Sequence, residues 1–595
     1  MRNGALILII GLALATPLVA SLEKVGCCNG LIECNNICTT TGNCNINYST
    51  CQPILLPFSQ SENAARRFAG VGHLQNIGDI REWNFHTDLN IEYQQNFDRA
   101  RLGMYFFPNG TNTILVGDDH TVSGSADIRG TDLGLSESFQ GLLTINPQIQ
   151  NLIVEPVLYV GFDGWVPGLW ADMTLPIVYT RWTMDACESN ITPGNSSFNP
   201  PSISAPPLSA IDTYTVVQNS MKNGGVSPSL GMIPSDTVQS DIGLSTPVGA
   251  RSICQAFAGT TWGDKQTPLR AGRILCNQPS QKTGVADIPI QLGYNFVQRE
   301  VCYLGLFARA VLPTGRINNE GTLFDATIGY NRYQAGAGIQ GRLMLYEKGG
   351  DSAINFYASM YVTHIFGHHE CRVVDMNRGC FSRYLLMKEA DAAGNYTGRL
   401  VNFADVFTVC VNSRFNWNFD ALAYFDLSHR GWNWQFGYEG KARDHESFDC
   451  DVTLCNPCND SHECSPSAIG TKQYGVKGPQ IIGGVGSKVL DASDTTINTF
   501  GVQAVPYQTP TGAQIPPLVQ PSGTLINAQN FTNYIDLESA RIPLAVAQKF
   551  WTHVGYTWQR RCPIAAGFGF EIDWGNFNQA PQFWGIWGKV TFGCN

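Results

Sequence analysis

Charged residues are scarce in this chain. Asp, Glu, Lys and Arg make up 14% of its 595 residues, against about 25% in ordinary soluble proteins. Strong overall hydrophobicity is missing too, because mean hydropathy is −0.09 and the polar mass consists of Asn, Gln, Ser, Thr and 61 Gly. The formal net charge is −10, and there is no basic stripe to neutralise phosphates. The composition therefore argues against nucleic-acid binding.

Beyond residue 20 the sequence lacks an apolar run of the ~20 residues that a transmembrane helix needs. Residues 1–20 predict a secretory signal, with Arg2 as its positive start, an apolar core over 5–15 and a cleavage site ending at Ala20. An uncleaved anchor is the alternative, but the apolar run is too short for it. The chain is expected to be exported, and strands are its only means of crossing a membrane.

Signatures of catalysis are also missing. There is no GxSxG motif, and the ten histidines are scattered. Residues 336–341 match GxGxxG, but a dinucleotide site needs a helix after the motif, whereas residues 342–345 read as a strand. Glycines that relieve crowding in a curved strand are the better interpretation. We predict no enzyme activity and no bound cofactor.

One short cluster invites a metal-site hypothesis. Its members are His364, His368, His369, Glu370 and Cys371. The spacing of His364 and His368 would align two ligands only on a helix, and this segment ends a strand and enters a loop. A polar loop tip is the preferred interpretation, and no metal is predicted.

What the sequence does contain is apolar–polar alternation, clearest over residues 415–443. In the first arm Phe415, Trp417, Phe419, Ala421, Ala423 and Phe425 alternate with mostly polar residues. A turn at 428–431 follows, and Trp432, Trp434, Phe436 and Tyr438 then alternate with Asn433, Gln435 and Glu439. Because successive side chains of a strand point to opposite faces, the pattern predicts a hairpin of two long strands with one apolar face.

The same alternation recurs over 83–94, 288–296, 302–312, 354–362 and 564–574. It predicts an all-β fold, a large up-and-down antiparallel transmembrane barrel of about 14–18 strands. We expect the barrel to occupy residues 81–595, with long loops at about 187–250 and 445–530. Segments near 100–145, 320–335, 380–410 and 480–545 have no clear pattern. Residues 21–80 form a cysteine-rich segment, in which Ser61 is expected to cap a short helix over 61–68.

Nineteen cysteines fit an oxidising compartment, and their odd number leaves at least one free or bonded to another molecule. Cys187 and Cys254 lie near the two ends of the first long loop, where a bridge between them would tie off its base. Two disulfides are expected among Cys450, Cys455, Cys458 and Cys464, with a zinc knuckle or a redox CxxC as the alternatives. The six cysteines over 27–51 predict a disulfide-stapled knob, with zinc binding as the alternative.

Lipid or a water-soluble core could cover the apolar face. A soluble sandwich would carry Lys and Glu on its exposed face, whereas the polar faces here are mostly Asn, Gln, Gly, Asp and Thr. Aromatic residues gather near strand ends, where membrane interfaces would hold them. The pairs are Phe415/Trp417, Trp432/Trp434, Trp551/Trp558 and Trp574/Trp584. We therefore assign the apolar face to lipid.

With its signal sequence, aromatic hairpins and final strand Trp584–Phe592, the chain resembles porin-type bacterial outer-membrane β-barrels over about residues 80–593. Such barrels usually end on an aromatic residue that the assembly machinery reads, whereas residues 593–595 here follow Phe592, which puts that signal in doubt. The cysteine content is similar to that of cysteine-rich major outer-membrane proteins and of large uncharacterised envelope proteins of host-associated bacteria. The resemblance implies a location in the bacterial outer membrane.

The leading functional hypothesis is a passive diffusion channel for small hydrophilic solutes. Asp420, Glu439, Lys441 and Arg443 are predicted to face its lumen. The alternatives are a structural or adhesive surface protein cross-linked by disulfides, and a secreted soluble β-rich protein. The expected partners are the lipid bilayer and small solutes, and the sequence leaves open a homo-oligomer or disulfide-linked neighbours.

Overall fold

The structure is a computed structural model. It describes residues 53–71, 83–107, 109–117, 127–130, 133–135, 139–192, 250, 252–261, 265, 267–317, 321–377, 379–393, 396–449, 452–455, 469–477, 489–490, 525–558, 562–575 and 580–594. The predicted signal sequence, the cysteine knob over 27–51, Cys450, Cys458 and Cys464, and most of both predicted long loops lie outside the described residues.

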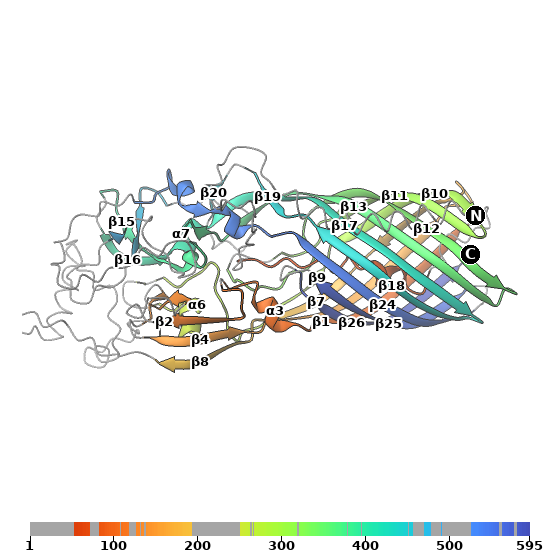
Figure 1. Cartoon of the computed structure of the whole chain (residues 1–595). Coiled ribbons are helices and arrows are strands. Elements are labelled where there is room, and N and C mark those ends of the chain that lie inside the picture. Colours follow the sequence, from red (N-terminus) through yellow and green to blue (C-terminus); the bar gives the residue numbers. More distant parts are fainter. Residues whose placement is uncertain are drawn as a thin grey trace, which may run out of the picture. The chain divides into compact units, whose positions relative to one another are not determined.

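Twelve antiparallel strands close into a barrel, whose neighbouring strands run side by side in Figure 1. In ring order they are β1 (Asn84–Asn96), β26 (Phe583–Cys594), β25 (Ile564–Gly575), β24 (Ala545–Trp558), β18 (Trp432–Arg443), β17 (Val409–His429), β13 (Ser352–Arg372), β12 (Gln334–Lys348), β11 (Cys302–Leu312), β10 (Ile288–Arg299), β6 (Leu169–Thr174) and β5 (Gln148–Gly161). The ring closes because β1 pairs with both β26 and β5, so that Leu89 lies between Val590 and Pro156.

The predicted all-β barrel is confirmed. The closed ring has twelve strands, fewer than the 14–18 expected for the barrel. The hydrogen-bonded sheet that contains the ring has 16 strands, because it also includes β7 (Ile177–Thr183), β9 (Ser280–Val285), β19 (Glu446–Phe448) and β20 (Thr453–Leu454). Strand β5 pairs with β6 along one part and with β7 along another, so β6 and β7 share one place in the ring. Pro176 interrupts them, since proline cannot donate to the ladder.

The barrel is apolar outside and polar inside. On β1, Leu89 and Ile91 are 41% and 49% exposed, whereas Asn90 and Glu92 are fully buried. Each of the twelve strands exposes large apolar side chains: Phe85, Leu89, Ile91, Leu152, Leu158, Met173, Ile290, Leu292, Tyr294, Phe296, Leu306, Leu312, Leu345, Tyr346, Met360, Val362, Phe366, Phe425, Trp432, Trp434, Phe436, Phe550, Trp558, Phe568, Phe570, Trp574, Ile586, Val590 and Phe592. A closed antiparallel barrel with an apolar exterior is the architecture of bacterial outer-membrane proteins, and this chain has it.

Two of the predicted lipid-facing aromatic residues lie inside instead. Phe415 is fully buried and packs with Ile365, because the pairing of β13 with β17 shifts register near Thr363 and Ile365. A one-residue shift moves a side chain to the opposite face. Trp551 is buried as well, since the even-numbered residues of β24 face outward.

The two ends of the barrel differ in their connections. At one end the turns are short, and the predicted hairpin turns at Arg430 and Gly431, whose φ angles are 48° and 87°. Positive φ at both positions is what a two-residue hairpin of right-handed twist requires. At the other end the connections are long, and their described parts fold into a separate region that we call the cap.

The cap contains small sheets and short helices (Figure 1). One sheet consists of β3 (Ile128–Arg129), β2 (Thr113–Gly117), β4 (Gln140–Ile145) and β8 (Ala186–Thr192), and another of β16 (Tyr396–Asn402), β15 (Leu386–Ala390), β21 (Gln473–Lys477) and β22 (Val489–Leu490). A third pairs β14 (Asp375–Met376) with β23 (Ile535–Asp536). The helices are α3 (Arg99–Gly103), α6 (Ile253–Ala258), α7 (Phe403–Phe407), and the 3₁₀ turns η3 (Ser382–Tyr384), η4 (Phe531–Asn533) and η5 (Leu537–Ala540). Among the described residues, no helix is long and apolar enough to cross a bilayer.

The cap has a hydrophobic core of its own. Phe106, Phe257, Tyr384 and Phe407 belong to one buried cluster, which also includes Trp182 of β7 and so reaches the barrel. These residues come from segments whose sequence shows no clear alternation. Each segment contributes only a few apolar side chains, which is too few to form a recognisable pattern. Their burial becomes visible only after the segments have met.

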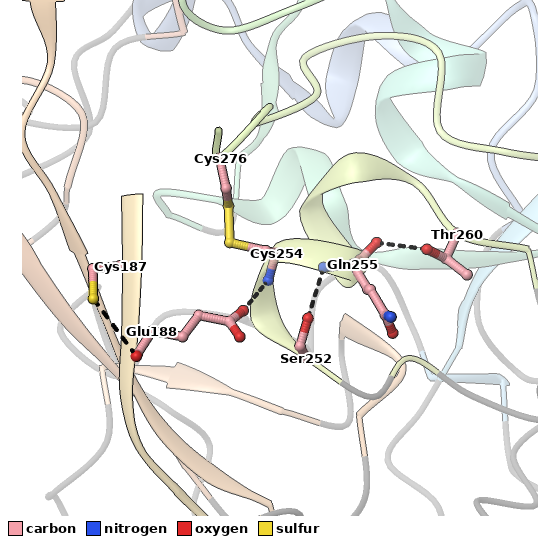
Figure 2. Close-up of a disulfide and its surroundings, with 7 residues drawn as sticks. All are labelled: Cys187, Glu188, Ser252, Cys254, Gln255, Thr260 and Cys276. Carbon is pink, nitrogen blue, oxygen red and sulfur yellow. Dashed lines mark hydrogen bonds between the residues drawn. A yellow bond between two sulfur atoms is a disulfide. The ribbon is translucent and has the colours of Figure 1, made fainter. Parts of the chain in front are cut away.

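Two of the predicted disulfide arrangements are wrong. Cys254 bonds to Cys276, and Cys187 is a free, exposed thiol (Figure 2). The Glu188 carboxylate next to Cys187 instead accepts a hydrogen bond from the Cys254 amide. This contact, rather than a Cys187–Cys254 bridge, joins β8 to α6.

The second error concerns Cys455, which bonds to Cys371 and not to a cysteine of its own loop. The reason is that β20 pairs with the first two residues of β17, and one of these, Cys410, lies opposite Cys371 in the pairing of β13 with β17. Cys380 and Cys410 are also disulfide-bonded.

The apolar exterior generates a prediction for Leu292, which lies on β10 with its side chain 55% exposed. The variant Leu292→Arg should destabilise the barrel by about 2–4 kcal/mol if the side chain meets hydrocarbon. Equilibrium unfolding in lipid vesicles would measure this loss. The matched control is Val301→Arg in the adjacent turn, where the change should be close to zero. Equal stability of both variants would contradict a lipid-facing exterior.

Candidate functional site in the barrel lumen

Residues 53–71, which we call the lumen segment, lie among the inward-facing side chains of the barrel. A short helix, α2 (Ala64–Phe68), forms in this segment. It begins later than predicted, because its cap is Asn63 and not Ser61. The Asn63 side-chain oxygen accepts a hydrogen bond from the Arg66 amide at 3.0 Å, whereas the Ser61 and Ser59 hydroxyls hydrogen-bond each other at 2.9 Å.

The lumen segment runs lengthwise through the barrel. At the cap end, Arg443 donates a hydrogen bond to the Leu56 carbonyl at 2.7 Å. Further in, Gln435 accepts one from the Gly70 amide at 2.8 Å. Arg443 and Gln435 lie on the same strand, about 26 Å apart at a rise of about 3.3 Å per residue. The segment therefore passes along most of β18.

The four residues predicted to face the lumen, Asp420, Glu439, Lys441 and Arg443, are all buried. Glu439 accepts hydrogen bonds from the amides of Ala64 and Ala65 at 3.1 and 3.2 Å. A carboxylate at this position satisfies free amides at the start of α2.

The other three residues are placed along the same wall. Lys441 pairs with Glu439 at 3.0 Å and also donates to the Glu62 carbonyl. Asp420 accepts a hydrogen bond from the Tyr361 hydroxyl at 3.4 Å. Glu439, Lys441 and Arg443 thus contact the lumen segment, and the role of all four residues in a pore stays a prediction.

The strongest attachment of the lumen segment is Arg66. Its side chain is fully buried and forms ion pairs with Glu92 of β1 and Glu155 of β5. Arg66 Nη2 donates to the Gln60 carbonyl at 3.0 Å. In the ion pair with Glu155, Nε donates to Oε1 at 3.0 Å and Nη2 donates to Oε2. The guanidinium therefore meets Glu155 through two nitrogens, the bidentate geometry that makes arginine–carboxylate pairs strong and directional.

Neighbouring contacts continue around the wall. Arg67 pairs with Asp172 of β6 at 2.9 Å and donates to Gln291 of β10 at 2.6 Å. Lys589 of β26 donates to the Arg66 and Arg67 carbonyls at 3.2 and 2.8 Å. Strands far apart in the sequence thus bind the same two residues of α2.

A second basic residue, Lys549 of β24, pairs with the carboxylates on the neighbouring part of the wall. Its ammonium group lies 3.0 Å from Glu571, 3.7 Å from Glu439 and 3.8 Å from Asp573. Asn63 of the lumen segment donates to Glu571 at 3.0 Å. The segment is therefore held by charged and polar groups, which water could solvate if it moved.

An aromatic layer surrounds the far end of α2. Phe68 belongs to a buried cluster with Ala65, Ala69, Tyr303, Tyr357, Leu422, Tyr424, Trp551 and Trp587. The rings of Tyr357 and Tyr424 stack at a centroid distance of 4.7 Å. Gly70 follows with φ +74°, and a Cβ there would lie 2.9 Å from His553 Cε1. Glycine is needed both for this backbone conformation and for the close approach to the wall.

Between the segment and the wall lies a cavity of about 40 Å³. This is room for a few water molecules and not for a solute. Its lining includes Glu62 and Asn63 of the segment, and Asn151, Lys549 and Asp573 of the wall. With the segment in place, the lumen is occluded at this level.

Residues 364–371, which were considered as a metal site, make structural contacts. Glu370 forms ion pairs with Arg332 and Arg372, Cys371 is in a disulfide, and His364 Nδ1 lies 2.9 Å from the Asn416 carbonyl oxygen. The GxGxxG stretch lies within β12, where a Cβ on Gly336 would come within 1.9 Å of a carbonyl oxygen of β13. Close packing of strands explains these glycines.

Sequence reasoning missed the attachment of Arg66 and Arg67. The two arginines stand side by side in a chain that has few charges, and one of the facing carboxylates, Glu92, lies on the polar face of a predicted strand. This combination was the available signal. It could not show that the segment before the first strand turns into the barrel, because ion-pair partners 89 residues from Arg66 and 105 residues from Arg67 carry no local pattern.

No family model matches the chain, and no curated protein matches it. Solved structures similar to it include an outer-membrane channel from Pseudomonas putida F1, with a TM-score of 0.30, 9% identity, and coverage of 87% of this chain and 98% of that one. Others are the β domain of the Bordetella autotransporter BrkA (0.23, 8%, 86% and 98%) and a Pseudomonas aeruginosa FadL homologue (0.22, 6%, 86% and 90%).

The geometry around Glu439 predicts how the lumen segment is held. The variant Glu439→Ala leaves Lys441 and Lys549 with fewer partners and frees the amides of α2. Breaking such a buried pair costs about 3–5 kcal/mol. Hydrogen–deuterium exchange of peptides covering 60–71 should therefore become faster. The control is Glu347→Ala at the exposed end of β12, and equal exchange in both variants would show that Glu439 does not hold the segment.

Proposed function

We propose that this protein is an outer-membrane channel for small hydrophilic solutes that opens when the lumen segment moves. The observation that carries the proposal is the polar attachment of residues 53–71 inside a twelve-stranded barrel. Barrels of about 8 strands are filled by their own side chains, and those of 16 or more leave an aqueous channel. A ring of twelve lies between these sizes, and here an added segment fills the space.

The size of α2 indicates what an open state would pass. A helix with its side chains is about 10–12 Å across, so its withdrawal would leave an opening suited to small hydrated solutes. Beside the aromatic layer, the wall around α2 is lined by charged and amide side chains, which favour water over an apolar solute. The passive diffusion channel expected from the sequence gains a gate in this proposal, because residues 53–71 occupy the lumen.

The arginine contacts predict the behaviour of the channel in planar bilayers. The double variant Arg66→Ala/Arg67→Ala removes the ion pairs with Glu92, Glu155 and Asp172. Its open probability should rise about tenfold or more, which corresponds to the loss of about 1.4 kcal/mol from the closed state. Heat-modifiable gel mobility would verify that the barrel has folded.

The matched control for this experiment is Arg299→Ala, in an exposed position at the turn end of β10. It should behave as the unchanged protein does. If neither the unchanged chain nor the folded double variant conducts ions at any voltage, the channel function is wrong. Unchanged gating in the double variant would mean that the lumen segment is not the gate.

A surface protein that presents the cap is the second candidate, and the exposed thiol of Cys187 favours it. In this function the barrel anchors the cap, and Cys187 joins neighbouring molecules through a disulfide. Non-reducing electrophoresis of intact cells should then show oligomers that reductant dissolves and that Cys187→Ser abolishes. Monomers alone, before and after reduction, would contradict this candidate.

A further inference from the structure

Carboxylates outnumber basic groups among the buried side chains of the barrel strands. The acidic residues are Asp88, Glu92, Glu155, Asp172, Glu370, Asp420, Asp426, Glu439 and Glu571, and the basic residues are Arg309, Arg372, Lys441, Arg443, Lys549 and Lys589. The lumen segment opposes this imbalance, because it adds Arg66 and Arg67 against Glu62. If the segment left, the wall would keep an excess of negative charge in a narrow space.

The positions of the segment's own cations mark where this charge is concentrated. The fully buried guanidinium of Arg66 is bound between the carboxylates of Glu92 and Glu155. Arg67 adds a second cation, 2.9 Å from Asp172. Three carboxylates from β1, β5 and β6 thus form adjoining cation sites that need partners whenever the arginines are absent, since an unpaired buried charge is costly.

Further acceptor groups stand beside these carboxylates. Asn90 donates from its amide nitrogen to Glu155 at 3.3 Å, and its buried amide oxygen has no partner among the described residues. The amide oxygen of Asn151 is likewise buried without a described partner, and Asn151 lines the cavity. Gln94 lines the same cavity and donates to Glu92 at 2.7 Å. Acceptor oxygens therefore lie both at the cavity and beside the carboxylates that bind Arg66.

We propose that Glu92, Glu155 and Asp172 are the cation-selective site of this channel, and that Arg66 and Arg67 occupy it in the closed state as a bound solute would. The open channel then passes cations in preference to anions, and it favours organic cations that carry a guanidinium group. Rings of carboxylates select cations in this way in other pores, and the planar guanidinium matches a carboxylate pair through two hydrogen bonds. The inference rests on the proposed channel function.

Reversal potentials across planar bilayers with unequal KCl concentrations test the selectivity. Open events of the full chain should give a potassium-to-chloride permeability ratio above one. In the double variant Glu92→Gln/Glu155→Gln the ratio should fall at least about twofold, because two fixed charges leave a lumen in which fields are weakly screened. The control is Glu347→Gln, which should leave the ratio unchanged. Two results would overturn the inference but leave the channel function standing. One is an anion-favouring ratio in the conducting full chain, and the other is an unchanged ratio in the conducting double variant.

A second measurement does not depend on conduction. Methylguanidinium chloride at millimolar concentration should compete with Arg66, and hydrogen–deuterium exchange of peptides covering 60–71 should become at least about twofold faster than in equal sodium chloride. The increase should be lost in the folded Glu92→Gln/Glu155→Gln variant. If no open events are ever seen, this competition still tests the site. Equal exchange in both salts would then refute it.

Discussion

The constraint on which this structure depends is that every backbone amide and carbonyl in a bilayer must find its partner within the protein. Strands satisfy it only by closing, and here β1 completes the ring by pairing with both β26 and β5. Closure separates an outer apolar face from an inner polar face. It also creates a lumen, which residues 53–71 enter and fill.

The lumen is filled partly by aromatic packing around Phe68 and partly by charged and polar contacts. A wholly apolar filling would gain the hydrophobic effect throughout and would be permanent. Arg66, Arg67 and Asn63 instead meet Glu155, Asp172 and Glu571, and buried pairs of this kind add little net stability because both partners lose hydration. Such an attachment is specific in position and reversible in principle. It is the physical basis for the gate and the cation site that we propose.

Local patterns predicted the barrel well and its contents poorly. The hairpin at 415–443 turns where the sequence indicated, and the buried positions of Glu439, Lys441 and Arg443 follow from simple alternation. Phe415 broke the rule, because a register shift opposite it reversed the two faces. The cap core and the bonds of Cys254 and Cys455 were not predictable from spacing, since each depends on segments that meet only in the folded chain.

The sequence alone determined the fold class and, apart from positions such as Phe415 and Trp551, the two faces of the predicted strands, because alternation with a period of two is a local property of the chain. Only the tertiary structure decided how many strands close the ring, which segment enters it and which charges meet there. These outcomes depend on contacts between residues far apart in sequence, such as Arg66 with Glu155 and Asn63 with Glu571. Their energies appear only when the ring has closed and water has left the lumen.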